Sequence, residues 1–382
     1  MNFDYSEEQL LVQKTAREFA QEQLRPGVKE RDDKMEYPTE QIKMLGEMGF
    51  MGMMVPEEWG GAGFDALSYS LAEEEISRED ASAGVVMSVN NSLVCQLLMD
   101  WANDDQKEKY LKKLSSGEWL GAFSLSEPQA GSDASNLLCN AKRDGDHYIL
   151  NGTKNWVTSG INSNVVMVFA VTEKGIGHKG VSAFIVEKGI AGFTTGKKEN
   201  KLGIRASDTC ELYFDDCRLP VDNRIANEGD GFKIAMKTLD GGRIGIASQA
   251  LGIGRAALEE SVRYAQERKQ FGKSLSSFGA IREKIAKMSI NLDAARLLTH
   301  KAAVLKDKKQ PYSKASAQAK WLASKTAMEA ATECVQIFGG YGYMQEYGVE
   351  RLMRDAKITQ IYEGTSEVQL LVIARAVMEE LS

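Results

Sequence analysis

The chain has 382 residues, of which 43% are hydrophobic and 26% are charged. This composition is typical of a soluble globular protein and excludes disorder over the whole chain, and the length predicts two or three domains. The balance of 54 acidic and 47 basic residues gives a net charge of −7. That charge argues against a protein that binds nucleic acid through its overall field, so an anionic ligand would need a local basic cluster.

Neither a membrane span nor a signal peptide is expected. No apolar run reaches the roughly 20 residues that a span requires, and the acidic N-terminus lacks an apolar signal core. The five cysteines and three histidines are scattered, without a CxxC pair. The sequence therefore supports neither a disulfide framework nor a zinc site, and the simplest expectation is a cytoplasmic protein without a metal.

The first part of the chain, residues 1–118, is expected to be helical. Ser6 and Gln9 have the spacing of a capping box, and Pro38 introduces a second helix that continues to Met48. Further helical patterns cover residues 66–76, 84–99 and 104–114.

The middle part, residues 119–228, changes to the pattern of β-strands. Strands are predicted over residues 147–150, 165–171, 181–186 and 209–214. Asn151-Gly152 predicts a tight turn after the first of these. Gly175–Gly180 matches GxGxxG, but a strand rather than a helix is expected to follow it, so we interpret it as a hairpin loop and not as a dinucleotide site.

The last part, residues 229–382, returns to helical periodicity. Because proline breaks helices from within and this part contains only Pro311, long helices are expected. Asp240-Gly241-Gly242-Arg243 is predicted to open the longest of them. The predicted helices cover residues 232–239, 243–269, 278–306, 312–338 and the segment after Ser366.

Three loops could serve either structure or a ligand. Residues 124–133 form a small and polar segment that could bind phosphates or a polar ring, or could be a plain linker. Trp156-Val157-Thr158 could pack in the core or line a planar cofactor. Residues 336–343 contain three glycines that could stop a helix or let a ligand approach the backbone. The Arg243 guanidinium is commonly a solvated cap and less often a ligand contact.

The segment Ile361–Gln369 is the most informative part of the chain. It places Glu363 in a glycine-containing break, and Ser366 with Gln369 predicts a capping box for a helix that starts at about Glu367. A carboxylate beside apolar groups loses hydration, so its pKa rises and it becomes a usable base near neutral pH. A solvated loop glutamate is the other interpretation.

Together and in this order, these segments resemble the acyl-CoA dehydrogenase family over nearly the whole chain. The most specific are LSEPQAGSD (125–133), NGTKNWVTSG (151–160), RKQFGK (268–273), QIFGGYGY (336–343) and IYEGTSEVQ (361–369). Two further stretches, MSVNNSL (87–93) and LDGGRIGIASQALGIGR (239–255), are most similar to the short-chain, butyryl-CoA dehydrogenase branch.

The resemblance implies an α+β multidomain fold. Its parts would be an N-terminal helical domain (1–118), a central β-barrel or sandwich-like domain (119–228) and a C-terminal four-helix-bundle domain (229–382). It also implies a homotetramer that holds FAD and oxidises a short-chain acyl-CoA to a trans-2-enoyl-CoA, as in fatty acid β-oxidation. Electrons would pass to an electron-transfer flavoprotein.

The resemblance also implies roles for single residues. Glu363 would be the base that removes the α-proton of the thioester, and its backbone amide would polarise the thioester carbonyl. Flavin contacts are implied for Phe123, Leu125, Ser126, Gly131, Ser132, Trp156, Val157, Thr158, Thr365 and Glu367. Contacts with the FAD of a neighbouring subunit are implied for Arg268, Phe271, Gln336, Ile337, Gly339 and Gly340. Contacts with the CoA substrate are implied for Ser132, Asp240, Arg243 and Gly364.

One departure concerns the adenine end of FAD. The family often has Pro after FGK and Gln after the following aromatic residue, whereas this chain has Ser274 and Gly279, so that side-chain contact is missing. Cys139 stands where Thr is common, which is a mild change. The alternatives are an acyl-CoA oxidase, a dehydrogenase or reductase for branched, aromatic or dicarboxylic acyl-CoA, and a non-catalytic helical scaffold.

Overall fold

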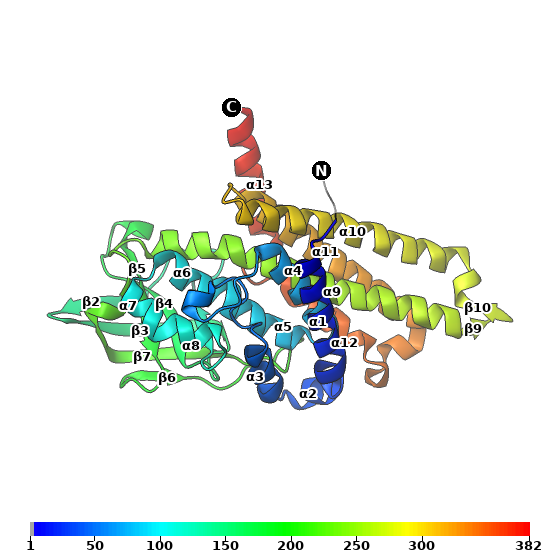
Figure 1. The fold of residues 1–382 in the computed structure, drawn as a ribbon, viewed down its shortest axis with the longest axis horizontal. Coiled ribbons are helices and arrows are strands. Elements are labelled where there is room, and N and C mark those ends of the chain that lie inside the picture. The colour runs from blue at the N-terminus through cyan, green and yellow to red at the C-terminus, as the bar shows by residue number, and fades with distance from the viewer. Residues whose placement is uncertain (1–3) are drawn as a thin grey trace.

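The computed structural model describes residues 4–382. Figure 1 shows an elongated molecule with a sheet at one end and the far ends of long helices at the other. The N-terminal helices lie between them and contact both the sheet and the long helices. The predicted order of a helical part, a sheet and a second helical part is therefore confirmed.

The N-terminal part is made of short helices. The capping box predicted at its start is confirmed, because the Gln9 amide donates to Ser6 Oγ at 3.2 Å and the Ser6 amide donates to Gln9 Oε1 at 3.0 Å. Three π-helical segments, η1 (Ala20–Leu24), η3 (Val89–Cys95) and η4 (Lys107–Leu111), continue helices without a break. The helices are α1 (Glu7–Phe19), α2 (Val28–Lys34), α3 (Thr39–Glu47), α4 (Ala66–Glu79), α5 (Ala81–Ser88), α6 (Gln96–Trp101), α7 (Asp104–Gln106) and α8 (Lys112–Ser115).

The continuous helical stretch Ala81–Trp101 corrects the expectation that no apolar run has the length of a membrane span. Its 21 residues are long and apolar enough to cross a membrane, judged by length and composition alone. However, 89% of the apolar window is buried inside the molecule, where it packs between the N-terminal core and α9 (Gly231–Glu267). This burial is what a core helix of a globular protein requires.

The sheet has eight strands in the order β6-β7-β3-β2-β4-β5-β8, with β1 beside β4. β2 and β4 share a single residue pair, Asn140 and Val171, so the sheet folds into two halves. Leu150 and Leu212 from one half meet Val168 from the other in one core cluster, which is a sandwich-like arrangement. The strands are β1 (Gly121–Ser124), β2 (Asn140–Asp144), β3 (His147–Thr158), β4 (Val165–Val171), β5 (Val181–Glu187), β6 (Phe193–Thr195), β7 (Thr209–Pro220) and β8 (Arg224–Ile225).

Strand β4 is apolar along its whole length because both of its faces are covered. Val166 and Val168 point into the core between the sheet halves, whereas Met167 and Phe169 belong to the larger core shared with the helices. Successive side chains of a strand point to opposite faces. The GxGxxG segment lies between the antiparallel strands β4 and β5, so its interpretation as a hairpin loop is confirmed.

The turn predicted at Asn151-Gly152 is wrong. Strand β3 runs through both residues to Thr158, and the turn to β2 lies before His147. Gly152 has φ +141°, and its pairing with β7 shifts register there, as in a β-bulge. A Cβ on Gly152 would lie 2.7 Å from the Cα of Cys139, so the glycine permits close packing within the sheet rather than a turn.

The C-terminal part is built on three long helices, α9, α10 (Gly279–Asp307) and α11 (Ser313–Phe338), which pack against one another. The shorter α12 (Val349–Thr359) packs on α9 and α11, and α13 (Ser366–Leu381) projects from the bundle (Figure 1). A two-stranded hairpin, β9 (Lys269–Gln270) and β10 (Lys273–Ser274), follows α9 at the end far from the sheet.

The helix start predicted at Asp240-Gly241-Gly242-Arg243 is also wrong. α9 runs uninterrupted for 37 residues from Gly231 to Glu267. Glycine costs roughly 1 kcal/mol in a helix relative to alanine, so the pair lowers helix stability without ending the helix. The packing around Gly242, described below, gives the reason for its presence.

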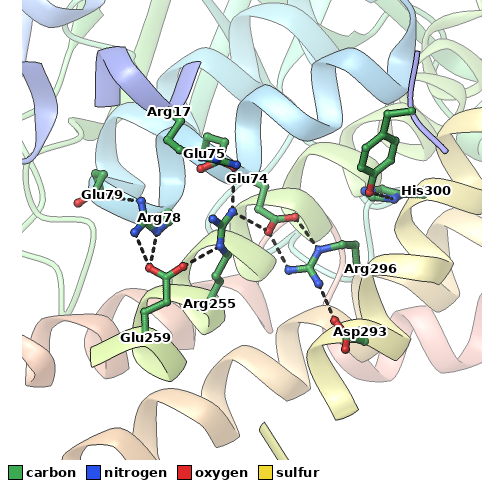
Figure 2. A network of polar contacts seen from close by, with 11 residues as sticks. Arg17, Glu74, Glu75, Arg78, Glu79, Arg255, Glu259, Asp293, Arg296 and His300 are labelled. Carbon is green, nitrogen blue, oxygen red and sulfur yellow. Dashed lines mark hydrogen bonds and ion pairs between the residues drawn. The ribbon is translucent and has the colours of Figure 1, made fainter. Parts of the chain in front are cut away.

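Ion pairs fasten the N-terminal helices to the bundle (Figure 2). Glu74 and Glu75 of α4 are buried, and each meets arginines from other helices. Arg255 of α9 bonds Glu75 at 2.8 Å, Arg296 of α10 bonds Glu74 at 2.9 Å, and Arg17 of α1 bonds Glu75 at 2.7 Å. Because removing one partner would leave a buried charge uncompensated, this network fixes how α4 lies against α9.

Candidate active site

Glu363 lies in the turn between α12 and α13, in a backbone conformation that side chains rarely adopt. Its φ is +51°, and Gly364 beside it has φ +91°. The Gln369 side-chain amide donates from Nε2 to the carbonyl oxygens of Glu363 at 3.2 Å and of Gly364 at 2.9 Å. The capping box predicted at Ser366 is wrong, because Thr365 is the N-cap and accepts from the Val368 amide at 3.3 Å. Gln369 therefore supports the turn instead of capping the helix.

The Glu363 carboxyl group points into the interior against α9. A Cβ on Gly242 would lie 2.2 Å from Glu363 Oε2 and 2.7 Å from Leu93 Cδ2, so only glycine leaves room for the carboxyl group. The residue as a whole is half-buried, but Oε2 is shut off from solvent and has no hydrogen-bond partner within residues 4–382. Burial raises the pKa of Glu363 to about 7, although Lys320 and Arg243 oppose the rise.

Two buried cations lie near this carboxyl group. Lys320 of α11 donates from Nζ to the Gly364 carbonyl at 2.7 Å, and burial lowers its pKa to about 7. Arg243 of α9 pairs with Asp240 at 2.6 Å, and its Nε finds no partner in the described part of the chain. The sequence-predicted residues Asp240, Arg243, Glu363 and Gly364 thus come together in one place.

The surroundings of Glu363 toward α4 and α5 are polar and tightly packed. The Tyr362 hydroxyl donates to Gln249 Oε1, and the Gln249 amide donates to the Ala81 carbonyl at 2.8 Å. One turn along α9 from Gly242, a Cβ on Gly245 would lie 2.5 Å from the Tyr69 hydroxyl. Space beside the carboxyl group is therefore limited along α9.

A second cluster of predicted residues lies where β1 and the following loop meet the end of β3. The Asn155 amide donates to the Ser126 carbonyl at 2.9 Å. Beneath them, Lys154 donates to the Leu125 carbonyl at 3.0 Å and pairs with Glu127 at 2.8 Å, and both charged groups are buried. This internal ion pair makes the loop a rigid wall and not a loose linker.

The outer face of this wall carries one exposed aromatic side chain and several polar or small residues. Trp156 has φ +58° and leaves 63% of its surface exposed, which is unusual for an indole at the end of a strand. Thr158, two residues further along β3, and Phe123 of β1 are half-buried. Gly131 has open space around it, and Ser132 is exposed. The Leu125 and Val157 side chains are buried, so these two residues can offer only backbone atoms to a ligand.

The third set of predicted residues lies at the opposite end of the molecule, after α9 and α11 (Figure 1). The Arg268 guanidinium lies 5.3 Å from the ring centre of Tyr341, Phe271 is 93% exposed, and the Ile337 side chain is buried. Gln336, Gly339 and Gly340 are exposed. Within one chain, these residues do not join the wall at β1 and β3. Thr365 and Glu367, by contrast, flank Glu363, the first half-buried and the second exposed.

Sequence reasoning missed Gly242, Lys320, Gln249 and Gln369 as neighbours of Glu363. The glycine pair was noticed and assigned to a helix start. Lys320 lies in an alanine-rich helical pattern where a lysine is normally solvated, so no local signal distinguished it.

Comparisons with known proteins agree with this geometry. Family models for the acyl-CoA dehydrogenase N-terminal, middle and C-terminal domains match residues 6–118, 122–217 and 229–378. A short-chain-specific acyl-CoA dehydrogenase from Clostridium acetobutylicum is 49% identical over 374 residues, covering 98% of this chain and 99% of that protein. The structure of butyryl-CoA dehydrogenase from Megasphaera elsdenii is 48% identical with a TM-score of 0.98, covering 99% of this chain and all of that one.

A chain solved in work on the electron transferring flavoprotein of Acidaminococcus fermentans is 49% identical with a TM-score of 0.98, and the match covers 99% of this chain and all of that one. The fold and site place the molecule among helical–sheet–helical oxidoreductases. The chain belongs to the acyl-CoA dehydrogenase family.

Proposed function

We propose that this protein is an FAD-dependent short-chain acyl-CoA dehydrogenase that converts an acyl-CoA thioester to a trans-2-enoyl-CoA and passes electrons to an electron-transfer flavoprotein. The observation that carries the proposal is the Glu363 carboxyl group. Its Oε2 is buried without a hydrogen-bond partner among residues 4–382, and its pKa is raised to about 7. Relatives specific for short-chain and butyryl-CoA substrates support the choice of substrate.

Glu363 would remove the proton from the carbon next to the thioester carbonyl. A base for this weak acid must be ionised near neutral pH yet poorly hydrated, and a positioned general base contributes roughly 10²–10⁴-fold to the rate. Burial supplies the poor hydration, and the charges of Lys320 and Arg243 keep ionisation within the neutral range. The Glu363 backbone amide would polarise the thioester carbonyl, as an oxyanion hole does.

The wall formed by β1, the following loop and the end of β3 would hold the ring system of FAD. Trp156 offers an exposed aromatic face, and Ser126, Gly131, Ser132 and Thr158 lie on the same segments with polar or open surface. When bound, FAD accepts the hydride from the β-carbon. The residues of the chain bind and orient it and exclude water from Glu363.

The residues at the far end would reach the FAD of a neighbouring subunit in a homotetramer. Arg268, Phe271 and Gly340 are exposed or half-exposed there. They lie at the end of the molecule opposite the wall that would hold the flavin of the same chain. Ser132, Asp240, Arg243 and Gly364 would contact the CoA substrate. A cytoplasmic location and domain boundaries near residues 118 and 228 remain predictions.

The test is the variant Glu363→Gln, which keeps the shape of the side chain and removes the base. We expect a yellow protein with normal flavin content and a turnover lowered by roughly 10²–10⁴-fold, measured with butyryl-CoA and an artificial electron acceptor. The wild-type kcat/KM should rise with pH through about 7, because only the ionised carboxylate accepts the proton.

Glu379→Gln is the matched control, since it changes an exposed glutamate of α13 in the same way and should leave turnover unchanged. A near-normal rate for Glu363→Gln would remove Glu363 from the mechanism. A colourless protein that is indifferent to added FAD would favour a non-catalytic scaffold. A series of C4 to C16 acyl-CoA substrates would define the chain length, where each methylene is worth about 1–3 kcal/mol.

A further inference from the structure

Lys320 is a buried lysine that contacts the turn carrying the proposed base. It lies on α11, its side chain has no exposed surface, and its Nζ donates to the Gly364 carbonyl at 2.7 Å. A lysine is almost never fully buried without a pairing partner. Among residues 4–382, the polar contact that its ammonium group makes is the hydrogen bond to the Gly364 carbonyl, and the carboxylates of Glu363 and Glu367 act on it at longer range.

The Gly364 carbonyl is held by two donors, one charged and one neutral. The Lys320 ammonium group lies at 2.7 Å and the Gln369 amide at 2.9 Å. Glu363 and Gly364 both have positive φ, a conformation that the surrounding structure must hold in place for a residue such as glutamate. The two donors therefore fix the Gly364–Thr365 peptide plane, and the Gln369 side-chain amide also donates to the Glu363 carbonyl at 3.2 Å. Together these bonds hold the turn from which the Glu363 side chain points toward α9.

The charge of Lys320 also acts on the Glu363 carboxyl group and lowers its pKa. Few other charged groups near Glu363 have a comparable effect. Arg243 approaches from α9, but its charge is paired with Asp240 at 2.6 Å. Glu73 on α4 is buried and its pKa is raised by burial, which favours its neutral form. The other titratable groups that face Glu363 or Lys320 are Tyr69 of α4, Tyr362 of the turn and Glu367 of α13.

We propose that Lys320 is a positioning residue for the base, in which one ammonium group both holds the Glu363–Gly364 turn and favours the ionised Glu363 carboxylate. This inference rests on the proposed function, in which Glu363 takes the α-proton. The proton moves from the substrate carbon to a Glu363 oxygen, and Lys320 neither gives nor takes a proton in this step. Lys320 is not assigned a contact with substrate or cofactor.

The charge and the hydrogen bond of Lys320 predict separable effects. Without the charge, burial acts on Glu363 with less opposition, so its pKa should rise and the acid limb of the pH profile should move to higher pH. Without a donor to Gly364, the turn should loosen and kcat should fall at every pH. Lys320→Met removes both, whereas Gln369→Leu removes a neutral donor and no charge.

The experiment compares pH profiles of kcat/KM for butyryl-CoA in the FAD-loaded enzyme. For Lys320→Met we expect the acid-limb midpoint to rise by about 1 pH unit. This shift alone is about a tenfold loss of kcat/KM at pH 6, and it adds to the fall in kcat at every pH. The KM at the plateau should stay within about twofold, since uniform binding is not affected. Gln369→Leu should lower kcat without moving the midpoint.

Lys306→Met is the matched control. Lys306 is a half-buried lysine of α10. Loss of hydration lowers its pKa to about 8, and its charged neighbours are Asp100 and Asp307 rather than Glu363. Its removal should leave the midpoint of the acid limb in place. A second readout is infrared titration of the Glu363 carboxyl band in the substrate-free holoenzyme, identified by its loss in Glu363→Gln. Lys320→Met should move that titration upward by the same amount.

Lys320→Gln is the second variant, because it keeps a polar group and loses only the charge. If Lys320→Met does not fold or bind FAD, Lys320→Gln must show the midpoint shift for the inference to stand. Unchanged midpoints in the folded Lys320 variants, with Glu363→Gln inactive, would overturn the role of Lys320 and leave the proposed function intact. An active Glu363→Gln would instead overturn the proposed function.

Discussion

The surroundings of Glu363 and the far end of the C-terminal bundle differ in how complete they are within one chain. Around Glu363, Gly242, Lys320 and Gln369 come from three helices and fill the space around the turn. At the far end, Phe271 is 93% exposed and Tyr343 is 83% exposed. Exposed aromatic clusters mark surfaces that bind something else. The chain therefore surrounds its proposed base with its own residues, whereas under the proposed function its far end would be completed by a neighbouring subunit.

The largest effect is expected where the interior holds a buried ion pair. Lys154→Met would leave the Glu127 carboxylate buried without its cation, at a cost of about 3–5 kcal/mol in the free energy of unfolding. Denaturant unfolding of the apoprotein would measure it. Lys142→Met, at an exposed position of neighbouring β2, should change stability by under about 0.5 kcal/mol. Equal losses of stability in the two variants would contradict the conclusion that the buried Lys154–Glu127 ion pair stabilises this wall.

The next effect concerns the fit of α9 against the base. Gly242→Ala places a methyl group 2.2 Å from Glu363 Oε2, so the carboxyl group must move. A displacement of about 1 Å can cost about 10²-fold in rate. We expect that loss in kcat, with little change in flavin content. Gly241→Ala is the control, because the nearest atom to its added methyl group is 3.7 Å away, and its kcat should match that of the wild type.

A smaller effect is expected at the exposed end. Phe271→Ala should weaken FAD binding by about tenfold, as truncation of an aromatic side chain at an interface does, while the unfolding free energy of the apoprotein stays the same. Flavin retention during dilution would measure FAD binding, and denaturant unfolding of the apoprotein would measure the free energy of unfolding. Ile176→Ala changes an exposed residue of the sheet domain and should alter neither. A loss of apoprotein stability in Phe271→Ala would show that the far end is completed internally.

The smallest effect distinguishes two neighbouring residues at the start of α13. Thr365→Ala removes the N-cap and should cost about 1 kcal/mol in stability. Ser366→Ala removes only a weak bond to the Gln360 carbonyl at 3.4 Å and should cost less than half of that. Thermal unfolding of the apoprotein would compare them. The reverse order would restore the helix cap that the sequence predicts at Ser366.

Much of the fold was predictable because its signals are local. The Ser6 capping box, the apolar strands β4 and β5, and the hairpin loop at Gly175–Gly180 depend on residues within a few positions of one another. The same reasoning failed at Asn151-Gly152 and at Gly241-Gly242. In both cases glycine was interpreted as a break in the chain, and at Gly152 and Gly242 it makes room for a neighbour that is distant in sequence.

The candidate site follows the same division. Glu363 was predicted from the Tyr362, Gly364 and apolar residues beside it, and the burial of Oε2 agrees with that prediction. Lys320 is 44 residues from the carbonyl that it contacts, and in sequence it looks like a solvated helix lysine.

The unbroken course of α9 sets a length scale for the whole assembly. Gly242 and Glu267 lie 25 positions apart on one helix, which at 1.5 Å per residue is about 38 Å. If the far end contacts the flavin of another subunit as proposed, the length of α9 sets the distance between two active sites. Inserting one residue between these points would lengthen it by about 1.5 Å and turn its end by about 100°, so adjacent catalytic centres inherit their spacing from a single helix.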